Sequence, residues 1–268
     1  MVHPWESGWD NSPRWDHLRA AHLKPRRPFR RLDRAHVRLA ERPTDRDYDG
    51  YLALAELLDE SDYDLTRYRE SSPFLVYDVL LDALWYRAAL DLGRMAKALG
   101  RPSLISRSEL GEFAAAFQER HWSESLGLYV DYDIVSARRI EVPTPAGLAA
   151  AASGLIAATQ ARDSLYRYLN TGPGLVPLWT TPPAVSGFDP VRYWRGPVWA
   201  PVNWLVWWGL RELGLRKEAD ALAATTLRLV ERSGFAEHFN PVDGSPGGSG
   251  SFSWTAAVTL ELLVDSVG

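Results

Sequence analysis

The chain of 268 residues contains no cysteine. This absence excludes a disulfide framework, a thiol nucleophile and a thiolate metal site, and it is typical of proteins in a reducing compartment. Long hydrophobic runs are also missing, because the longest, near residues 149–158 and 198–210, are shorter than the roughly 20 residues that span a bilayer. The first residues carry no charged-then-apolar leader pattern. We therefore expect a cytoplasmic globular protein with no membrane partner.

A strong charge of one sign is absent as well. Thirty basic and 34 acidic residues give a net charge of −4. A protein with this balance does not attract phosphate backbones, so a general nucleic-acid partner is not expected. At roughly 150 residues per domain, the length allows one large domain or two small ones.

Tryptophan, in contrast, is abundant: the chain has 12, of which five lie between residues 194 and 208. Sugar rings stack on flat aromatic faces, but helical cores also use tryptophan. The helical spacing of Trp204, Trp207 and Trp208 favours the core for those three. Tyr193 and Trp194 fall in a loop and Trp199 near a helix start, where they could form a platform for a sugar.

Helical periodicity dominates the sequence. It predicts helices over residues 46–60, 74–99, 105–121, 145–158, 161–169, 199–213, 216–233 and 252–265. One strand is expected near residues 128–134. Short links between successive helices indicate antiparallel hairpins, whereas the other connections are long. Long ordered loops usually carry function, and a ring of helical hairpins would collect them at one end.

The first long loop, residues 3–16, is rich in Trp, Pro and Gly. Asp10 follows Gly8 and Trp9, and a carboxyl group beside large aromatic surface loses hydration, which raises its pKa. Such a carboxyl group is suited to act as a general acid near neutral pH. A turn or helix-capping role for Asp10 or Asn11 is the alternative.

A second carboxylate, Glu237, lies between apolar residues after a helix ends, and a Gly/Ser-rich loop over residues 243–251 follows it. If Glu237 faces a cavity, it can take a proton from a water molecule. If it does not, it is a solvated loop residue.

Four segments, in this order, resemble glycoside hydrolase family 63 and specifically its bacterial mannosylglycerate and glucosylglycerate hydrolase-like members. They are HPWESGWDNSPRWD from residue 3, RPTDRDYDGYLAL from residue 42, FDPVRYWRGPVWAPVNW from residue 188 and GFAEHFNPVDG…GSFSWTAA from residue 234. The resemblance implies an all-α fold, an (α/α)6 toroid of twelve helices in two rings. Only eight helices are predicted here. We therefore expect residues 1–268 to be the C-terminal two-thirds of one such catalytic domain, able to self-associate through the incomplete barrel.

The resemblance also implies hydrolysis of an α-glycosidic bond with inversion, without a metal or a cofactor. Asp10 matches the family's general acid and Glu237 its general base. The substrate would be a small glycoside such as glucosylglycerate or mannosylglycerate. The matching substrate-binding positions are Trp5, Gly8 and Trp199 along the sugar, Tyr193 and Trp194 near the bond that is cut, and Arg42 and Tyr48 at the glycerate carboxylate.

Three other interpretations compete. Asp45–Glu56 satisfies the EF-hand spacing D-x-D-x-D-G-x5-E, although Pro43 disrupts the entering helix that a calcium loop needs, and an acidic helix N-terminus explains the same residues. A non-catalytic carbohydrate-binding module or an inactive fragment is the second. Another enzyme on the same toroid, such as a sugar epimerase or an unsaturated-glycoside hydrolase, is the third. An epimerase would need histidine bases, and only His3 and His238 lie in the motif loops.

Overall fold

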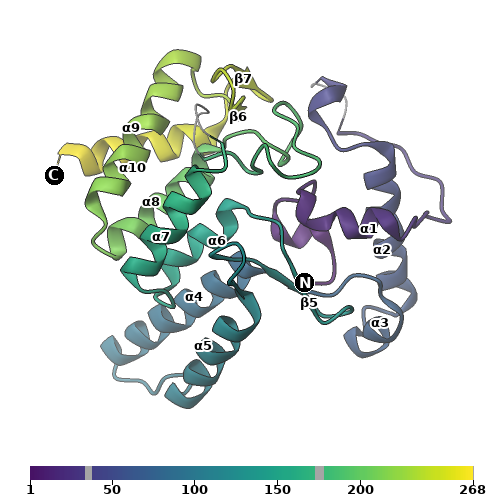
Figure 1. Ribbon diagram of the computed structural model, residues 1–268. Helices are drawn as coiled ribbons and strands as arrows, with labels where there is room; N and C mark the ends of the chain where they lie inside the picture. The colour runs from purple at the N-terminus through teal and green to yellow at the C-terminus, as the bar shows by residue number, and fades with distance from the viewer. Residues whose placement is uncertain (34–37, 173–177, 268) are drawn as a thin grey trace.

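The computed structural model describes residues 1–33, 38–172 and 178–267, and helices dominate these ranges (Figure 1). The α-helices are α1 (Asp16–Ala20), α2 (Asp45–Glu60), α3 (Leu65–Ser71), α4 (Val79–Ala98), α5 (Arg107–His121), α6 (Pro145–Ala149), α7 (Ala158–Leu169), α8 (Ala200–Glu212), α9 (Arg216–Ser233) and α10 (Ser253–Val267). Short 3₁₀ helices are η1 (Pro4–Ser7), η2 (Pro13–Trp15), η3 (Leu39–Glu41) and η4 (Ala150–Ser153). The all-α prediction is confirmed.

The strands are short and antiparallel. A three-stranded sheet has the order β1 (Val76–Tyr77), β4 (Asp131–Asp133), β5 (Arg138–Ile140), and two pairs are β2 (Trp122–Ser123) with β3 (Leu128–Tyr129) and β6 (His238–Phe239) with β7 (Pro246–Gly247). Along the described part of the chain, no helix is both long and apolar enough to cross a membrane.

The main core surrounds α8, which packs against α9, η4, α10 and α6. η4 approaches α8 closely at Gly209, where an added Cβ would lie 2.6 Å from Ala152 N. Tryptophans of α8 contribute as expected: Trp207 is buried, and Trp204 and Trp208 pack against the same core. In Figure 1, α4 to α10 lie together on one side of the molecule and α1, α2 and α3 on the other.

The structure differs from the sequence predictions at several elements. α4 begins at residue 79 rather than 74, because Asp78 caps it by accepting a hydrogen bond from Leu81 N (2.7 Å). The helix expected over 145–158 is α6 followed by η4, and it ends at Gly154 in a left-handed conformation (φ +84°). The expected strand 128–134 is divided into β3 and β4. The short helices α1 and α3 were not predicted.

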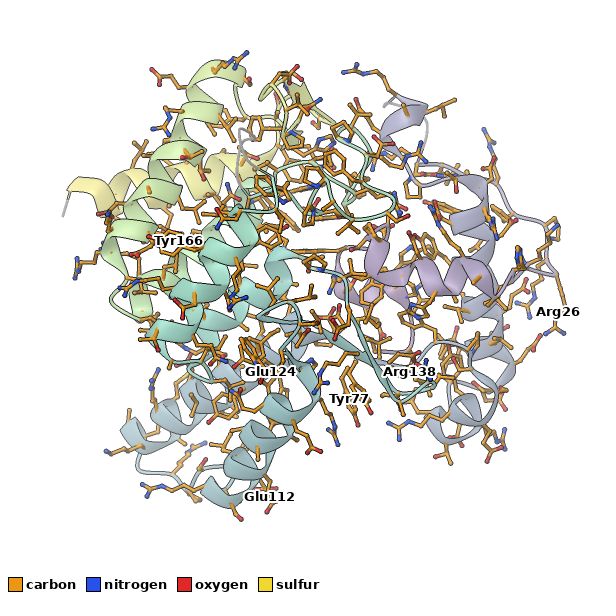
Figure 2. The ribbon with its side chains drawn as sticks, in the orientation of Figure 1. Arg26, Tyr77, Glu112, Glu124, Arg138 and Tyr166 are labelled. Atoms are coloured by element: carbon orange, nitrogen blue, oxygen red, sulfur yellow. The ribbon has the colours of Figure 1, made fainter. Side chains whose placement is uncertain are left out.

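Several apolar side chains on α4 and α10 face outward. Met95 on α4, Leu99 directly after α4, and Leu260 and Val264 on α10 are all more than half exposed. Charged side chains such as Glu112 and Arg26 lie at the periphery in Figure 2. Self-association through an incomplete barrel stays a prediction.

Candidate active site

The N-terminal loop that carries Asp10 is anchored by a histidine. His3 caps η1: its Nδ1 accepts a hydrogen bond from Trp5 N (3.1 Å), and its Nε2 lies 2.8 Å from Tyr51 O in α2. Because Nδ1 accepts, the proton belongs on Nε2, which donates to Tyr51 O. Burial lowers the pKa of His3 and so favours this neutral ring. Gly8 ends η1 with φ +69°, a conformation that favours glycine, and the chain turns there toward Asp10.

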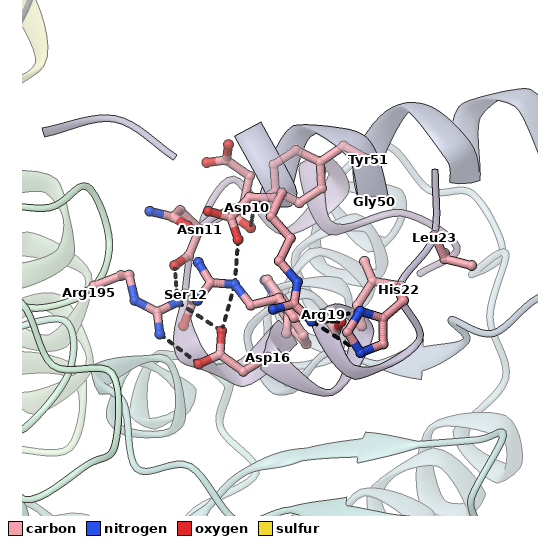
Figure 3. Close-up of a pocket in the computed structure, with 14 residues that line it drawn as sticks. Asp10, Asn11, Ser12, Asp16, Arg19, His22, Leu23, Gly50, Tyr51 and Arg195 are labelled. Atoms are coloured by element: carbon pink, nitrogen blue, oxygen red, sulfur yellow. Dashed lines mark hydrogen bonds and ion pairs between the residues drawn. The ribbon is translucent and has the colours of Figure 1, made fainter. Parts of the chain in front are cut away.

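Asp10 is half-buried beside α2. The hydroxyl of Tyr51 donates to Asp10 O at 2.6 Å and so fixes its backbone. Burial raises the pKa of the Asp10 carboxyl group to about 6, while a backbone N–H and the charge of Arg42 oppose the shift. A cavity of about 20 Å³, room for about one water molecule, adjoins Asp10 and extends toward Asp16 and Arg19 (Figure 3). The shift is in the direction that the sequence predicted.

A second loop, which leads into α8, is tied to the N-terminal loop by Arg195. Its guanidinium binds both carboxylate oxygens of Asp16, at 2.9 and 2.6 Å, and donates to Asn11 O at 3.2 Å (Figure 3). Asn11 Nδ2 donates in turn to Tyr193 O at 3.3 Å. These contacts join segments 179 residues apart in the sequence.

Three tryptophans, Trp9, Trp194 and Trp199, stack on one another near the contacts between these two loops. Trp194 lies parallel to Trp9 with ring centroids 5.1 Å apart and to Trp199 at 4.0 Å. Trp194 has φ +51°, an uncommon conformation for a tryptophan, which the stack on both of its faces holds in place. Trp194 and Trp199 are only 5% and 1% exposed, so they do not offer the open sugar platform that the sequence suggested. The stack instead supports the neighbouring Tyr193, whose ring meets Trp199 edge to face at 5.0 Å.

Glu237 lies just before β6 and is 6% exposed. Its Oε1 accepts from the hydroxyl of Tyr193 (3.1 Å), and its Oε2 accepts from Ser249 N (2.9 Å). The backbone N–H of Glu237 donates to Ser249 O at 2.7 Å. Gly248 turns with φ +66°, and an added Cβ there would lie 2.4 Å from Glu237 Oε2. The carboxylate is therefore buried with two donors and a fixed orientation.

Tyr193 contacts both loops: its hydroxyl donates to Glu237, and its backbone oxygen accepts from Asn11, the residue after Asp10. Burial raises the pKa of its hydroxyl, the charge of Glu237 raises it further, Arg42 opposes the shift and Asp10 adds to it. The Arg42 guanidinium lies 4.8 Å from the centre of the Tyr193 ring. The structure thus brings Asp10, Arg42, Tyr193 and Glu237 into one cluster, although the first two and the last two come from opposite ends of the sequence.

Trp5 and Tyr48 lie on the Asp10 side of this cluster. Their ring centroids are 6.4 Å apart, and Trp5 is 45% exposed. Burial raises the pKa of Tyr48, and the charges of Asp33 and Asp10 add to the shift. Of the tryptophans predicted to bind the substrate, Trp5 is therefore the one with an accessible ring.

Sequence reasoning missed the groups that hold the cluster together. Arg14 is buried between the rings of Trp9 and Trp15, and Arg195 is buried against Asp16. Both arginines lie within the segments that resemble the family, and that position was the only sign in the sequence that they belong to the site. Glu41, next to Arg42, is buried too, and nothing in its sequence context distinguishes it from a solvated residue.

The EF-hand spacing does not form a calcium loop. Asp45–Glu56 lies within α2, and Thr44 caps that helix together with Asp47. Asp47 also pairs with Arg19, and Glu56 accepts from the backbone N–H groups of residues 26 and 27. The alternative interpretation of these residues, an acidic N-terminus of a helix, is confirmed. Among the described residues, no group of three or more His, Asp or Glu side chains could hold a metal ion.

This helical fold brings the loops that carry Asp10 and Glu237 together through Tyr193. The family model described as a mannosylglycerate hydrolase MGH1-like glycoside hydrolase domain matches residues 1–255, and the chain belongs to that family. It is 38% identical over 272 residues to a mannosylglycerate hydrolase of Rubrobacter radiotolerans, and 32% identical over 278 residues to a glucosylglycerate hydrolase of Mycolicibacterium hassiacum. Each match covers 98% of this chain and 61% of the relative.

A solved structure agrees with these sequence matches. The glycoside hydrolase family 63 mannosylglycerate hydrolase of Thermus thermophilus, in complex with Tris and D-glycerate, superposes with a TM-score of 0.92 at 35% identity. The match covers 98% of this chain and 64% of that one. The predicted family and toroid fold are confirmed. The chain spans less than two-thirds of these relatives, and its assignment to the C-terminal two-thirds of one domain stays a prediction.

Proposed function

We propose that this chain carries the catalytic pair of an inverting α-glycosidase, with Asp10 as general acid and Glu237 as general base. The observation that carries the proposal is their shared neighbour: Tyr193 donates a hydrogen bond to Glu237, and its backbone oxygen accepts one from Asn11, the residue after Asp10. The two carboxyl groups also lie in different environments. Burial raises the pKa of Asp10, whereas Glu237 accepts hydrogen bonds from the Tyr193 hydroxyl and from Ser249 N.

The mechanism follows from these environments. Protonated Asp10 donates its proton to the glycosidic oxygen as the bond to the anomeric carbon breaks. Glu237 takes a proton from a water molecule, whose oxygen bonds to the anomeric carbon from the opposite face. This geometry requires about 6.5–9.5 Å between the carboxyl groups, and it inverts the anomeric configuration.

Arg42 supports a small anionic substrate. Its Nε is buried, and within the described residues no hydrogen-bond acceptor reaches that atom. A guanidinium with an unused donor binds a carboxylate well. The named relatives act on mannosylglycerate or glucosylglycerate, and the Thermus protein holds D-glycerate. We therefore propose that Arg42 and Tyr48 bind the glycerate carboxylate, and that Trp5 and Gly8 lie along the sugar.

Incubation of the chain with α-mannosylglycerate and α-glucosylglycerate tests this proposal. We expect hydrolysis of at least one of them, with the β-anomer of the free sugar appearing first in time-resolved NMR. The methyl ester of the same glycoside should react with a higher KM, because it lacks the charge that Arg42 binds. An α-anomer as the first product, or binding of the glycosides without turnover, would contradict the proposal.

The pH dependence provides a second test. Asp10 acts only when protonated, and its pKa of about 6 means that the active form is lost as pH rises through 6. We expect kcat/KM to fall tenfold per pH unit on the alkaline side, with a midpoint near pH 6. A profile that stays flat between pH 6 and 8 would exclude Asp10 as the titrating acid.

A further inference from the structure

A third carboxylate, Glu41, lies in the same cluster and has no part in the chemistry above. It is the last residue of η3 and is 6% exposed. Its Oε2 accepts a hydrogen bond from Gly248 N at 3.1 Å, and its backbone oxygen accepts from Tyr193 N at 2.9 Å. One residue therefore contacts both the 248–249 turn and the loop that carries Tyr193.

The 248–249 turn holds two carboxylates with consecutive amides. Gly248 N donates to Glu41, and the next amide, Ser249 N, donates to Glu237 Oε2. The two amide nitrogens flank Gly248, whose backbone adopts φ +66°, so a contact that holds Gly248 N also restrains the position of the adjoining Ser249 N. Loss of the Glu41 contact would release the turn from one of its two carboxylate acceptors.

The second link runs through Tyr193, whose hydroxyl is the other donor to Glu237. The backbone N–H of this same residue is held by Glu41 O. Both donors to the Glu237 carboxylate are therefore held by Glu41. Tyr193 is bound through its backbone N–H, and Ser249 follows Gly248, whose N–H binds Glu41 Oε2.

The remaining contact of Glu41 does not explain its burial. Oε1 pairs with Arg38 Nε at 3.0 Å, but the Arg38 side chain is 80% exposed. Exposed ion pairs contribute little to stability, whereas burying a carboxylate is unfavourable unless hydrogen bonds compensate. The contact that satisfies the buried oxygen is the one to Gly248.

From this arrangement we infer that Glu41 is a positioning residue, which holds the Gly248–Ser249 turn and Tyr193 so that Glu237 keeps the orientation needed to activate water. The inference rests on the proposed function. Glu41 transfers no proton in this role. It fixes the positions of the groups that donate hydrogen bonds to Glu237. A misplacement of about 1 Å at a reacting group can lower the rate about 100-fold.

Two conservative substitutions separate geometry from charge. Glu41→Gln keeps the length of the side chain and an amide oxygen that can accept from Gly248 N, but removes the charge. Glu41→Asp keeps the charge and withdraws the carboxylate by one methylene group. For a positioning role we expect Glu41→Gln to retain kcat within threefold, and Glu41→Asp to lower kcat by roughly 10- to 100-fold with little change in KM.

The matched control is Arg38→Ala, which removes the other partner of Glu41 and should leave kcat unchanged. Equal losses in the two Glu41 variants, or a larger loss in Glu41→Gln, would overturn the inference. In a Glu237→Gln background, Glu41→Asp should cause no further loss of the residual rate, because there is no base left to position.

Hydrogen exchange makes the test independent of turnover. We expect the amides of residues 248 and 249 to exchange faster in Glu41→Asp than in the wild-type chain, and at the wild-type rate in Glu41→Gln. If the wild-type chain hydrolyses neither glycoside, the proposed function fails, and this comparison still decides whether Glu41 holds the turn. Unchanged exchange in Glu41→Asp would refute that role.

Discussion

Asp10→Asn and Glu237→Gln should each lower kcat by about 10²- to 10⁴-fold, because each removes the proton transfer that we propose for its side chain. Asn and Gln keep the size of the side chains and their hydrogen-bonding oxygens, so the loss reports chemistry rather than packing. Steady-state kinetics on the glycoside that the wild-type chain hydrolyses best provides the measurement.

An activated substrate separates the two roles. An α-glycosyl fluoride needs no proton on its leaving group, so Asp10→Asn should recover most of its rate on the fluoride. Glu237→Gln should not, because water still has to be deprotonated. The alkaline loss near pH 6 should also disappear in Asp10→Asn.

Asp243→Asn is the matched control for these variants. It changes an exposed carboxylate in the loop after Glu237, and an asparagine oxygen can still accept from Ser245 N as Asp243 does. We expect wild-type kinetics from it. Full activity in Asp10→Asn on the glycoside, or recovery of Glu237→Gln on the fluoride, would show that the roles are assigned wrongly.

How far the sequence predicts this site depends on the range of the interactions. Asp10 and Glu237 lie in motifs that can be read locally, and aromatic neighbours correctly indicated a raised pKa for Asp10. Glu41 could not be found, because its burial depends on a backbone amide 207 residues away. The burial of Trp194 and Trp199 was not predicted for a related reason: Trp194 stacks between Trp199 and Trp9, and Trp9 comes from the other end of the chain.

The fold, too, is predicted well where local sequence determines an element and poorly where long-range contacts do. α2 begins with a capping box and α9 ends at Gly234, and the predicted bounds of both helices differ from the observed ones by at most one residue. α1 is five residues long and α3 seven, too short for periodicity to be recognised, and each has one buried side chain, Leu18 and Tyr68. Tertiary contacts rather than local pattern determine such helices.

Arg14 links the N-terminal loop that carries Asp10 to the helical body, and its replacement should have the largest effect on stability. The residue is 1% exposed, and its guanidinium lies between the rings of Trp9 and Trp15, 5.0 and 4.4 Å from their centres. Nη1 donates to Asp78 at 2.9 Å and to Asp131 at 3.1 Å. Asp78 caps α4 and Asp131 belongs to β4, so one side chain joins three segments.

Arg14→Met keeps an apolar chain between the two rings and leaves two buried carboxylates without their cation. Removing one partner of a buried ion pair typically costs about 3–5 kcal/mol in the free energy of unfolding. We expect a loss of that size in urea denaturation, compared with less than about 0.5 kcal/mol for the exposed Arg69→Met. A loss below about 1 kcal/mol would mean that the network is not required for the fold.

The loss in Arg14→Met should depend on pH. Burial already raises the pKa of Asp131, and Arg14 is the main charge that opposes this shift. Without Arg14 the folded-state pKa rises further above its unfolded value, so ionisation of Asp131 destabilises the variant increasingly as pH rises. We expect a larger deficit at pH 8 than at pH 5.

Adding Asp78→Asn and Asp131→Asn to Arg14→Met should recover most of the stability, because the triple variant buries no unpaired charge and Asn can still cap α4. A deficit that is the same at both pH values and persists in the triple variant would attribute the effect of Arg14 to packing between the tryptophans instead.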